Sequence, residues 1–306
     1  MDAAGAVADD GGRDVIRRWA RYVAGSYPPV RSVLFAWAWA FGVTGLFAAV
    51  QPHSPPWRPG ADTVVAAVTL TVMLLMHRAA DDFRDLDYDR RHNPRRPLAS
   101  GAVSVRDLAV LCAVGSVVVL ALNVDNPVAL ALMAGQLVYC AIVLSLHHWL
   151  RWPSGDRLLL SLAVSYPAPL LLHLYLYARY LHTTSLSPDR HGVLAVVILV
   201  FASVHLELAK KITRIRRPGE RSYVDIFGLA GTIGIALAAP VLSAALLITG
   251  ARSTPTLVPL AVLPLLLPAL AGRQFWRKRA PRWSPLAPGL YQLAVFICYF
   301  MLGLSY

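Results

Sequence analysis

The feature that most constrains this chain is the recurrence of apolar stretches of 16 or more residues along it. Only 15% of the residues are charged and 57% are hydrophobic, which is far from the composition of soluble domains. Stretches of this length are long enough to cross the hydrocarbon core of a bilayer as helices. The chain is therefore predicted to be an all-α integral membrane protein with no separate soluble domain.

The apolar pattern predicts nine transmembrane helices, of which the eighth is the weakest. Four prolines lie within that span or directly before it, and a proline inside a span is tolerated only where neighbouring groups satisfy the freed backbone. These prolines are Pro255, Pro259, Pro264 and Pro268. The predicted spans are 33–51, 62–80, 105–123, 127–147, 157–181, 191–209, 223–249, 256–271 and 285–305.

The distribution of basic residues predicts the orientation of these spans. If nine spans alternate, 25 of the 29 Lys and Arg residues fall on one side of the membrane. Because cytoplasmic loops carry an excess of Lys and Arg, the N-terminus is placed in the cytoplasm and the C-terminus on the opposite side of the cell membrane. The same asymmetry, with anionic lipid headgroups as its partners, explains the net charge of +12, so no nucleic-acid partner is predicted.

The N-terminal segment is predicted to have two parts. Residues 1–12 have neither a basic start nor an apolar core, so they are expected to be a disordered tail rather than a signal peptide. Residues 13–24 place Trp19 and Tyr22 on an apolar face opposite arginines, which predicts an interfacial helix on the cytoplasmic surface. Residues 13–306 are expected to form a single transmembrane domain.

Five aspartates are packed into nine positions directly after the second predicted span: Asp81, Asp82, Asp85, Asp87 and Asp89. On a continuous helix, Asp82, Asp85 and Asp89 would lie within about 60° of one another, with Asp87 on the opposite side. This spacing suits Mg²⁺, which binds one or two carboxylates and completes its shell with water and phosphate oxygens. At a membrane edge, the implied ligand has a diphosphate head and a lipid-soluble tail. The alternative is a solvated acidic loop paired with the arginines that follow it.

The stretch "DDFRDLDYDRRHNPRRPLASG" resembles the first aspartate-rich motif of the UbiA-type intramembrane prenyltransferases. That motif reads N-D-x-x-D-x-x-x-D followed by N-P-x-R-P-L, so Asp82, Asp85 and Asp89 fall on its three aspartates and Asp81 replaces its Asn. The resemblance implies a helical bundle around a large apolar cavity, capped by two cytoplasmic loops. It also implies that Mg²⁺, held by these three aspartates, binds a prenyl diphosphate beneath the caps.

The second aspartate-rich motif of that family, between its sixth and seventh spans, is altered here. Lys211 and Ile215 occupy its two aspartate positions. Its downstream end is matched by Gly219, Ser222, Phe227 and Gly228. If a helix continues to Pro218–Gly219, one of its faces carries Glu207, Lys210, Lys211 and Arg214. Lys and Arg bind diphosphate oxygens directly, so cations are expected to replace a second metal cluster. The alternative is an ordinary basic cytoplasmic loop.

The hypothesis from the sequence is a Mg²⁺-dependent prenyltransferase that ionises a prenyl diphosphate and passes the isoprenyl group to a lipophilic or aromatic acceptor. Three alternatives stay open: a terpene cyclase of the same fold, a polyprenyl-phosphate phosphoribosyl transferase, and a transporter of a lipid-linked or anionic solute. The predicted catalytic residues are Asp82, Asp85, Asp89, Lys210 and Lys211, the first three also as metal ligands. The predicted substrate-binding residues are Asp81, Arg90, Arg95, Arg96, Glu207, Arg214 and Asp225.

Overall fold

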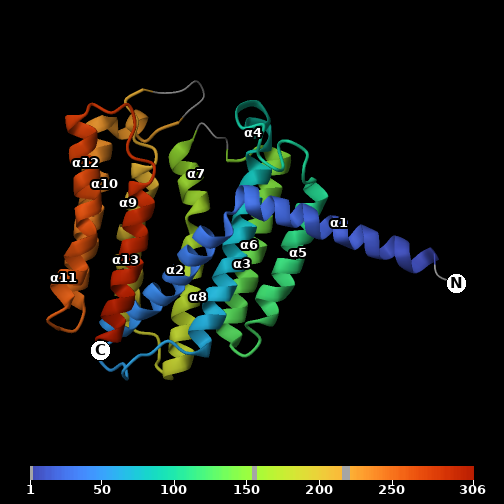
Figure 1. The fold of residues 1–306 in the computed structure, drawn as a ribbon. Helices are drawn as coiled ribbons and strands as arrows, with labels where there is room; N and C mark the ends of the chain where they lie inside the picture. Colours follow the sequence, from blue (N-terminus) through green and yellow to red (C-terminus); the bar gives the residue numbers. More distant parts are fainter. Residues whose placement is uncertain (1–2, 154–156, 216–220) are drawn as a thin grey trace. The chain divides into compact units, whose positions relative to one another are not determined.

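The structure, a computed structural model, describes residues 3–153, 157–215 and 221–306, and these residues are folded almost entirely into helices (Figure 1). The described residues contain no strand, and their one isolated bridge joins Thr213 to Arg282. The first helices are α1 (Ala3–Ser26), α2 (Pro29–Val50), α3 (Ala61–Arg84), α4 (Leu86–His92), α5 (Val105–Ala121), α6 (Pro127–Leu150) and α7 (Leu158–Ser165). The others are α8 (Pro167–Thr184), α9 (Arg190–Ala209), α10 (Val224–Gly250), α11 (Leu257–Val262), the 3₁₀ turn η1 (Leu263–Leu265), α12 (Leu266–Arg277) and α13 (Ala287–Leu304).

Eight segments of the described chain are helical, long enough and apolar enough to cross a membrane. They are α2, α3, α6, α7 with α8, α9, α10, α11 with α12, and α13. The predicted third span, 105–123, corresponds to α5, which has 17 residues and is shorter than these eight. The all-helical membrane architecture is thus confirmed, while the count of nine transmembrane helices stays a prediction.

Prolines and one glycine divide the predicted spans. Pro264 lies in η1, which separates α11 from α12, so the interruption expected in the eighth span is confirmed. The fifth span is also divided, since α8 starts at Pro167, and proline fits the first turn of a helix because it has no backbone N–H. Within α10, Gly228 has a φ of 67° and is not helical, a conformation that glycine adopts at little cost.

The N-terminal helix is longer than the sequence predicted. α1 runs from Ala3 to Ser26 without a break, so residues 3–12 are helical where a disordered tail was expected. Several alanines in residues 3–8 favour helix, and this local preference outweighs the polar residues that follow them. The predicted interfacial helix, 13–24, is the second half of α1.

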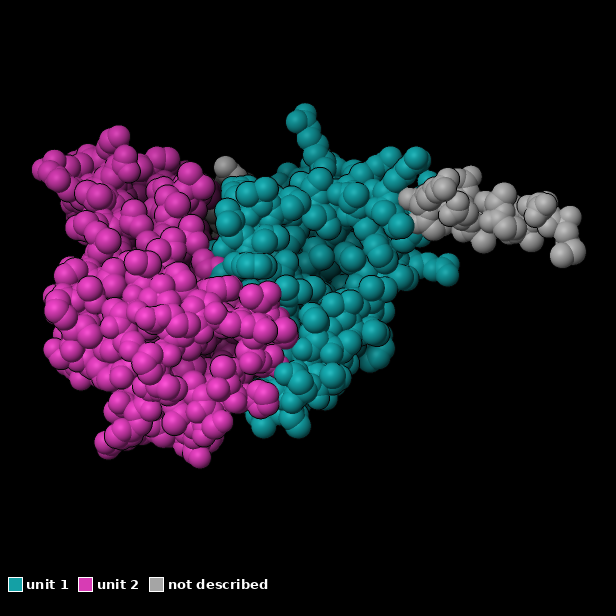
Figure 2. All heavy atoms as spheres, turned by 60° about the horizontal axis from the view of Figure 1, so that its bottom comes forward, with its two compact units in different colours: residues 1–37, 67–152 teal, residues 38–66, 153–306 magenta. Residues whose placement is uncertain are grey.

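The chain divides into two compact units, coloured separately in Figure 2. Unit 1 comprises residues 1–37 and 67–152, and unit 2 comprises residues 38–66 and 153–306. In unit 1, Tyr22, Leu98 and Leu108 share a buried cluster that fixes the loop between α4 and α5. In unit 2, Ile212 and Trp283 belong to the buried cluster beside the end of α9. The acidic motif therefore belongs to unit 1 and the altered second loop to unit 2.

Candidate active site

The acidic motif starts on α3 and continues on α4, with a short break at Asp85. Asp85 has φ −94° and ψ 5°, outside ordinary helical values. Two backbone hydrogen bonds still cross the break, from Asp85 N to Asp81 O (2.9 Å) and from Asp89 N to Asp85 O (2.8 Å). The predicted continuous helix is therefore wrong in detail, but helical spacing is kept on both sides of the break.

Asp82 is a buried carboxylate that receives hydrogen bonds from two elements. The Tyr22 hydroxyl on α1 donates to Oδ2 at 3.0 Å, and Arg78 Nη2 on α3 donates to Oδ1 at 2.6 Å. Arg96 Nη1 lies 3.5 Å from the same Oδ1. Because a buried carboxylate is costly without partners, these two guanidinium groups and one hydroxyl offset the cost of burying Asp82 in unit 1.

Asp89 is the second buried carboxylate, and it shares a partner with Asp82. Arg96 Nη1 donates to Asp89 Oδ2 at 2.5 Å, and Asn93 Nδ2 donates to Oδ1 at 2.8 Å. Arg96 therefore links Asp82 and Asp89 and fixes the "NPRRPL" turn against α4. The structure brings together three predicted site residues here, and it shows Arg96 in contact with the carboxylates.

Most of the other acidic and basic residues of the motif face solvent, whereas Arg84 is partly buried. Asp85 is exposed, and the pKa of its carboxyl is raised because the surrounding protein removes part of its water shell, although Arg84 lowers it. Asp81 is exposed and lies 3.8 Å from Arg84 Nη1. The predicted substrate-binding residues Arg90 and Arg95 are exposed as well. Asp87, predicted to point away from the metal face, pairs with Arg151 at 3.5 Å.

The donor set of the motif suits a hard divalent cation. Among the described residues, Asp82, Asp85 and Asp89 do not bring three ligand atoms within 4.8 Å of one another. Mg²⁺ does not need such a cage, because it binds one or two carboxylates and takes its other ligands from water and phosphate. Asp85 is the accessible carboxylate, whereas Asp82 and Asp89 are held by arginines.

The second predicted loop differs from the helix that the sequence suggested. α9 ends at Ala209, so Lys210, Lys211 and Arg214 follow the helix instead of continuing it. The chain turns there because Arg214 N donates to Pro281 O (2.7 Å). Pro218 and Gly219, expected to end that helix, lie outside the described residues.

Glu207 is the centre of the described part of this second loop. It forms ion pairs with Lys210 and, at 2.9 Å, with Lys211, and the Tyr223 hydroxyl donates to it at 3.0 Å. Burial and the charge of Glu207 raise the pKa of Tyr223, so its hydroxyl stays protonated and continues to donate. The structure thus brings together the predicted residues Glu207, Lys210 and Lys211.

The two other predicted residues of this loop, Arg214 and Asp225, have contacts with residues outside the Glu207 cluster. The Arg214 guanidinium lies over the rings of Phe275 (4.6 Å) and Trp276 (5.5 Å), a cation–π arrangement. Asp225 is exposed near the start of α10, where its Oδ2 lies 3.4 Å from Ser222 N. The predicted shared face is therefore reduced to Glu207 and the two lysines.

Two residues of the acidic cluster were missed by sequence reasoning. Arg78 precedes Asp82 by four residues on the same helix, a spacing that could have identified the pair. Tyr22 lies 60 residues away in sequence and was assigned to a surface-bound helix, so no local signal indicated its contact with Asp82.

The sequence model of the UbiA prenyltransferase family matches residues 38–297, most of the chain. The chain belongs to this family. A comparison with curated protein sequences gave no match. The UbiA match includes both the acidic motif of unit 1 and the altered second loop of unit 2.

Solved UbiA structures have the same fold at low sequence identity. An apo UbiA homologue from Aeropyrum pernix K1 is 21% identical, covers 88% of this chain and 96% of its own, and gives a TM-score of 0.64. A UbiA homologue from Archaeoglobus fulgidus bound to GPP and Mg²⁺ is 16% identical, and the match covers 94% of this chain and 100% of the homologue with a TM-score of 0.61. A structure described as digeranylgeranylglyceryl phosphate synthase is 13% identical, and the match covers 91% of this chain and 99% of the other chain with a TM-score of 0.55. These similarities establish the UbiA fold for this chain.

Proposed function

We propose that this UbiA-family protein ionises a prenyl diphosphate with the help of Mg²⁺ and transfers the isoprenyl group to a lipophilic or aromatic acceptor. The observation that carries this proposal is the intact first motif, in which Asp82, Asp85 and Asp89 occupy the three aspartate positions and Arg96 links two of them. The relative bound to GPP and Mg²⁺ supports the same chemistry. Asp81, Arg90 and Arg95 are proposed to contact the substrate from the exposed side of the motif.

Each residue of the first motif has a distinct part in the proposed reaction. Mg²⁺, when bound, supplies positive charge to the diphosphate leaving group. Asp85 offers an accessible carboxylate to the ion, while Arg78 and Arg96 pair with Asp82 and Asp89 and orient these carboxylates. The apolar spans exclude water, which would otherwise capture the allylic cation before the acceptor does.

We also propose that the cations of the second loop bind diphosphate oxygens directly. This part rests on residue types, since Lys211 stands where the family carries an aspartate. Glu207 holds the ammonium groups of Lys210 and Lys211 together, so both are available to one ligand. Arg214 and Asp225 are proposed to contact the substrate from the edge of this loop.

The proposed orientation places both loops on the cytoplasmic side. The positive-inside distribution supports nine spans, a cytoplasmic N-terminus and a C-terminus on the opposite side. Labelling of single cysteines introduced near each terminus with an impermeant thiol reagent in intact cells tests this: only the C-terminal one should react.

A product assay tests the proposed reaction. Purified protein is incubated with prenyl diphosphates of increasing length, with and without aromatic or alcohol acceptors, and the products are identified by mass spectrometry. We expect prenylated acceptor, formed with Mg²⁺ and abolished by EDTA. A hydrocarbon or alcohol product without acceptor would indicate a cyclase instead. No turnover of any prenyl diphosphate would favour a phosphoribosyl transferase or a transporter.

A further inference from the structure

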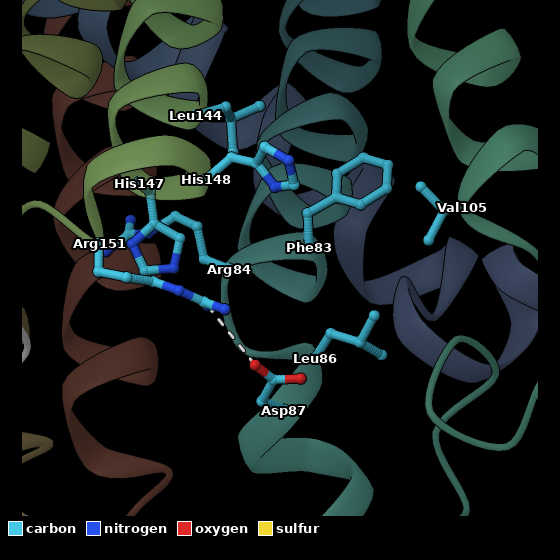
Figure 3. Close-up of a pocket in the computed structure, with 9 residues that line it drawn as sticks. All are labelled: Phe83, Arg84, Leu86, Asp87, Val105, Leu144, His147, His148 and Arg151. Atoms are coloured by element: carbon cyan, nitrogen blue, oxygen red, sulfur yellow. Dashed lines mark ion pairs between the residues drawn. The ribbon is translucent and has the colours of Figure 1, made fainter.

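A cavity of about 390 Å³ lies within unit 1 among the ends of α3 and α6 and the starts of α4 and α5 (Figure 3). None of Asp82, Asp85 and Asp89 lines it. The acid that lines it is Asp87, on the other side of α4. The proposed prenyl diphosphate chemistry therefore leaves this cavity unexplained.

The polar lining of the cavity consists of two arginines, two histidines and one aspartate. Arg84 and Arg151 contribute guanidinium groups, and His147 and His148 contribute imidazole rings. His147 Nδ1 is buried and has no hydrogen-bond partner among the described residues. A buried nitrogen of this kind is costly unless a ligand or water satisfies it.

The ion pairs of this lining are weak enough to be exchanged. Arg151 Nη1 lies 3.5 Å from Asp87, and these side chains are 74% and 62% exposed. Arg84 lies 3.8 Å from Asp81. Exposed pairs at such distances contribute little to stability, so an anion with several oxygens can replace the carboxylates. Phosphate is favoured, because guanidinium groups bind it through two parallel hydrogen bonds.

The surroundings of the cavity are those of a membrane surface. Phe83 and Leu144 form an apolar wall in Figure 3. Trp149 and Leu150, at the end of α6, are 78% and 68% exposed, which is typical of side chains at the boundary between lipid and water. Basic pockets between transmembrane helices are suited to anionic lipid headgroups.

We propose that this cavity binds a phosphate group through Arg84, Arg151 and the two histidines, in addition to the prenyl diphosphate of the proposed function. The phosphate has two possible sources, the headgroup of an anionic phospholipid and free phosphate. In the lipid case the acyl chains lie along the apolar wall of Phe83 and Leu144. Asp87 competes with the phosphate for Arg151, so removal of the Asp87 carboxylate is expected to raise the affinity of the cavity for phosphate.

Native mass spectrometry of the full chain in detergent tests the proposal with three probes. They are phosphatidylglycerol, a diacylglycerol with the same acyl chains but no phosphate, and inorganic phosphate. We expect phosphatidylglycerol to bind and diacylglycerol not to bind. Binding to the double variant Arg84→Gln/Arg151→Gln should be at least about tenfold weaker, since each cation near a headgroup contributes roughly a fivefold effect. Arg106→Gln, an exposed cation outside the cavity, is the matched control and should change binding less than twofold, or about 0.4 kcal/mol.

A second variant is expected to change the affinity for phosphatidylglycerol in the opposite direction. Asp87→Asn removes the competing carboxylate and should tighten phosphatidylglycerol binding, whereas a general loss of structure would weaken it. If the double variant does not fold, Arg151→Gln alone tests the same contact at a largely exposed position. Saturation by inorganic phosphate with the same dependence on the variants identifies free phosphate as the source, and binding of phosphatidylglycerol alone identifies the lipid. Equal binding of diacylglycerol, equal binding to the double variant, or weaker binding to Asp87→Asn would overturn the proposal.

Discussion

Replacing Tyr22 with Phe removes a single oxygen from a buried contact of the acidic cluster. The Tyr22 hydroxyl is fully buried and donates to Asp82 Oδ2 at 3.0 Å. Burial and the neighbouring Asp82 carboxylate raise the pKa of Tyr22, so the hydroxyl stays protonated and donates throughout the working pH range. Phe fits the same space, so the variant isolates this hydrogen bond.

The expected magnitude follows from the partners that Asp82 keeps. A hydrogen bond to a charged group contributes about 1.5–3 kcal/mol, and Arg78 and Arg96 still compensate the carboxylate after the change. We expect the free energy of unfolding to fall by about 2 kcal/mol. Outer partners of metal ligands typically change metal affinity by about 10–100-fold. We therefore expect the Mg²⁺ concentration for half-maximal activity to rise by about tenfold, with little change in kcat at saturating Mg²⁺.

The assay is diphosphate release by purified protein across a Mg²⁺ titration, with Tyr27→Phe as the matched control. The Tyr27 hydroxyl also donates from the N-terminal segment, but to the backbone oxygen of Thr71 at 3.1 Å and not to the cluster. Its loss should cost about 1 kcal/mol of stability and leave the Mg²⁺ dependence unchanged. An unchanged Mg²⁺ midpoint for Tyr22→Phe would refute the idea that α1 orients a metal-binding carboxylate.

Two further predictions concern the fold. A Cβ on Gly42 would lie 2.3 Å from the backbone oxygen of Phe296, so Gly42→Ala should lower stability by about 1–3 kcal/mol in thermal unfolding. Gly135→Ala, with no atom within 4 Å of its Cβ, should be neutral or stabilising by up to about 1 kcal/mol, and equal losses for both would contradict the packing argument. Asp189 caps the N-terminus of α9. Burial alone would raise the pKa of its carboxyl, but hydrogen bonds, including those from His191, lower this pKa overall. The charged carboxylate therefore stabilises the fold at neutral pH, and this stabilisation is lost as the pH falls through the lowered pKa. The difference in Tm between wild type and Asp189→Asn should therefore be positive at pH 7 and shrink as the pH falls below the ordinary range of an aspartate, whereas a difference independent of pH would contradict this.

The spans could be predicted from sequence because their information is local. Each one needs only about 20 apolar residues, and proline marks its interruptions, as Pro264 does. The end of α9 at Ala209 could not be predicted in this way, because it depends on contacts with residues near Pro281, about 70 positions away. Tertiary contacts of this kind override local helix preference.

The candidate site shows the same division between local and distant information. The aspartates on α3 and α4 were predicted from their spacing, which survives the break at Asp85. Their partners were only partly predicted: Arg96 was named, but Tyr22 was placed on a surface helix. Nothing in the local sequence distinguishes a tyrosine that faces lipid from one that reaches a buried carboxylate of another element.

Asp85 and Asp87 offer the most direct test of the central claim, because both are exposed aspartates two residues apart on the same motif. The measurement is the rate of diphosphate release from a prenyl diphosphate in Mg²⁺, with acceptor present, for wild type, Asp85→Ala and Asp87→Ala. Asp85→Ala should lower the rate at least about 100-fold, because it removes the accessible carboxylate that binds Mg²⁺, and the charge of this ion stabilises the leaving group. Asp87→Ala should retain a rate close to that of wild type. Equal rates for Asp85→Ala and wild type, or equal losses in both variants, would contradict the assignment of the first motif as the Mg²⁺-diphosphate site.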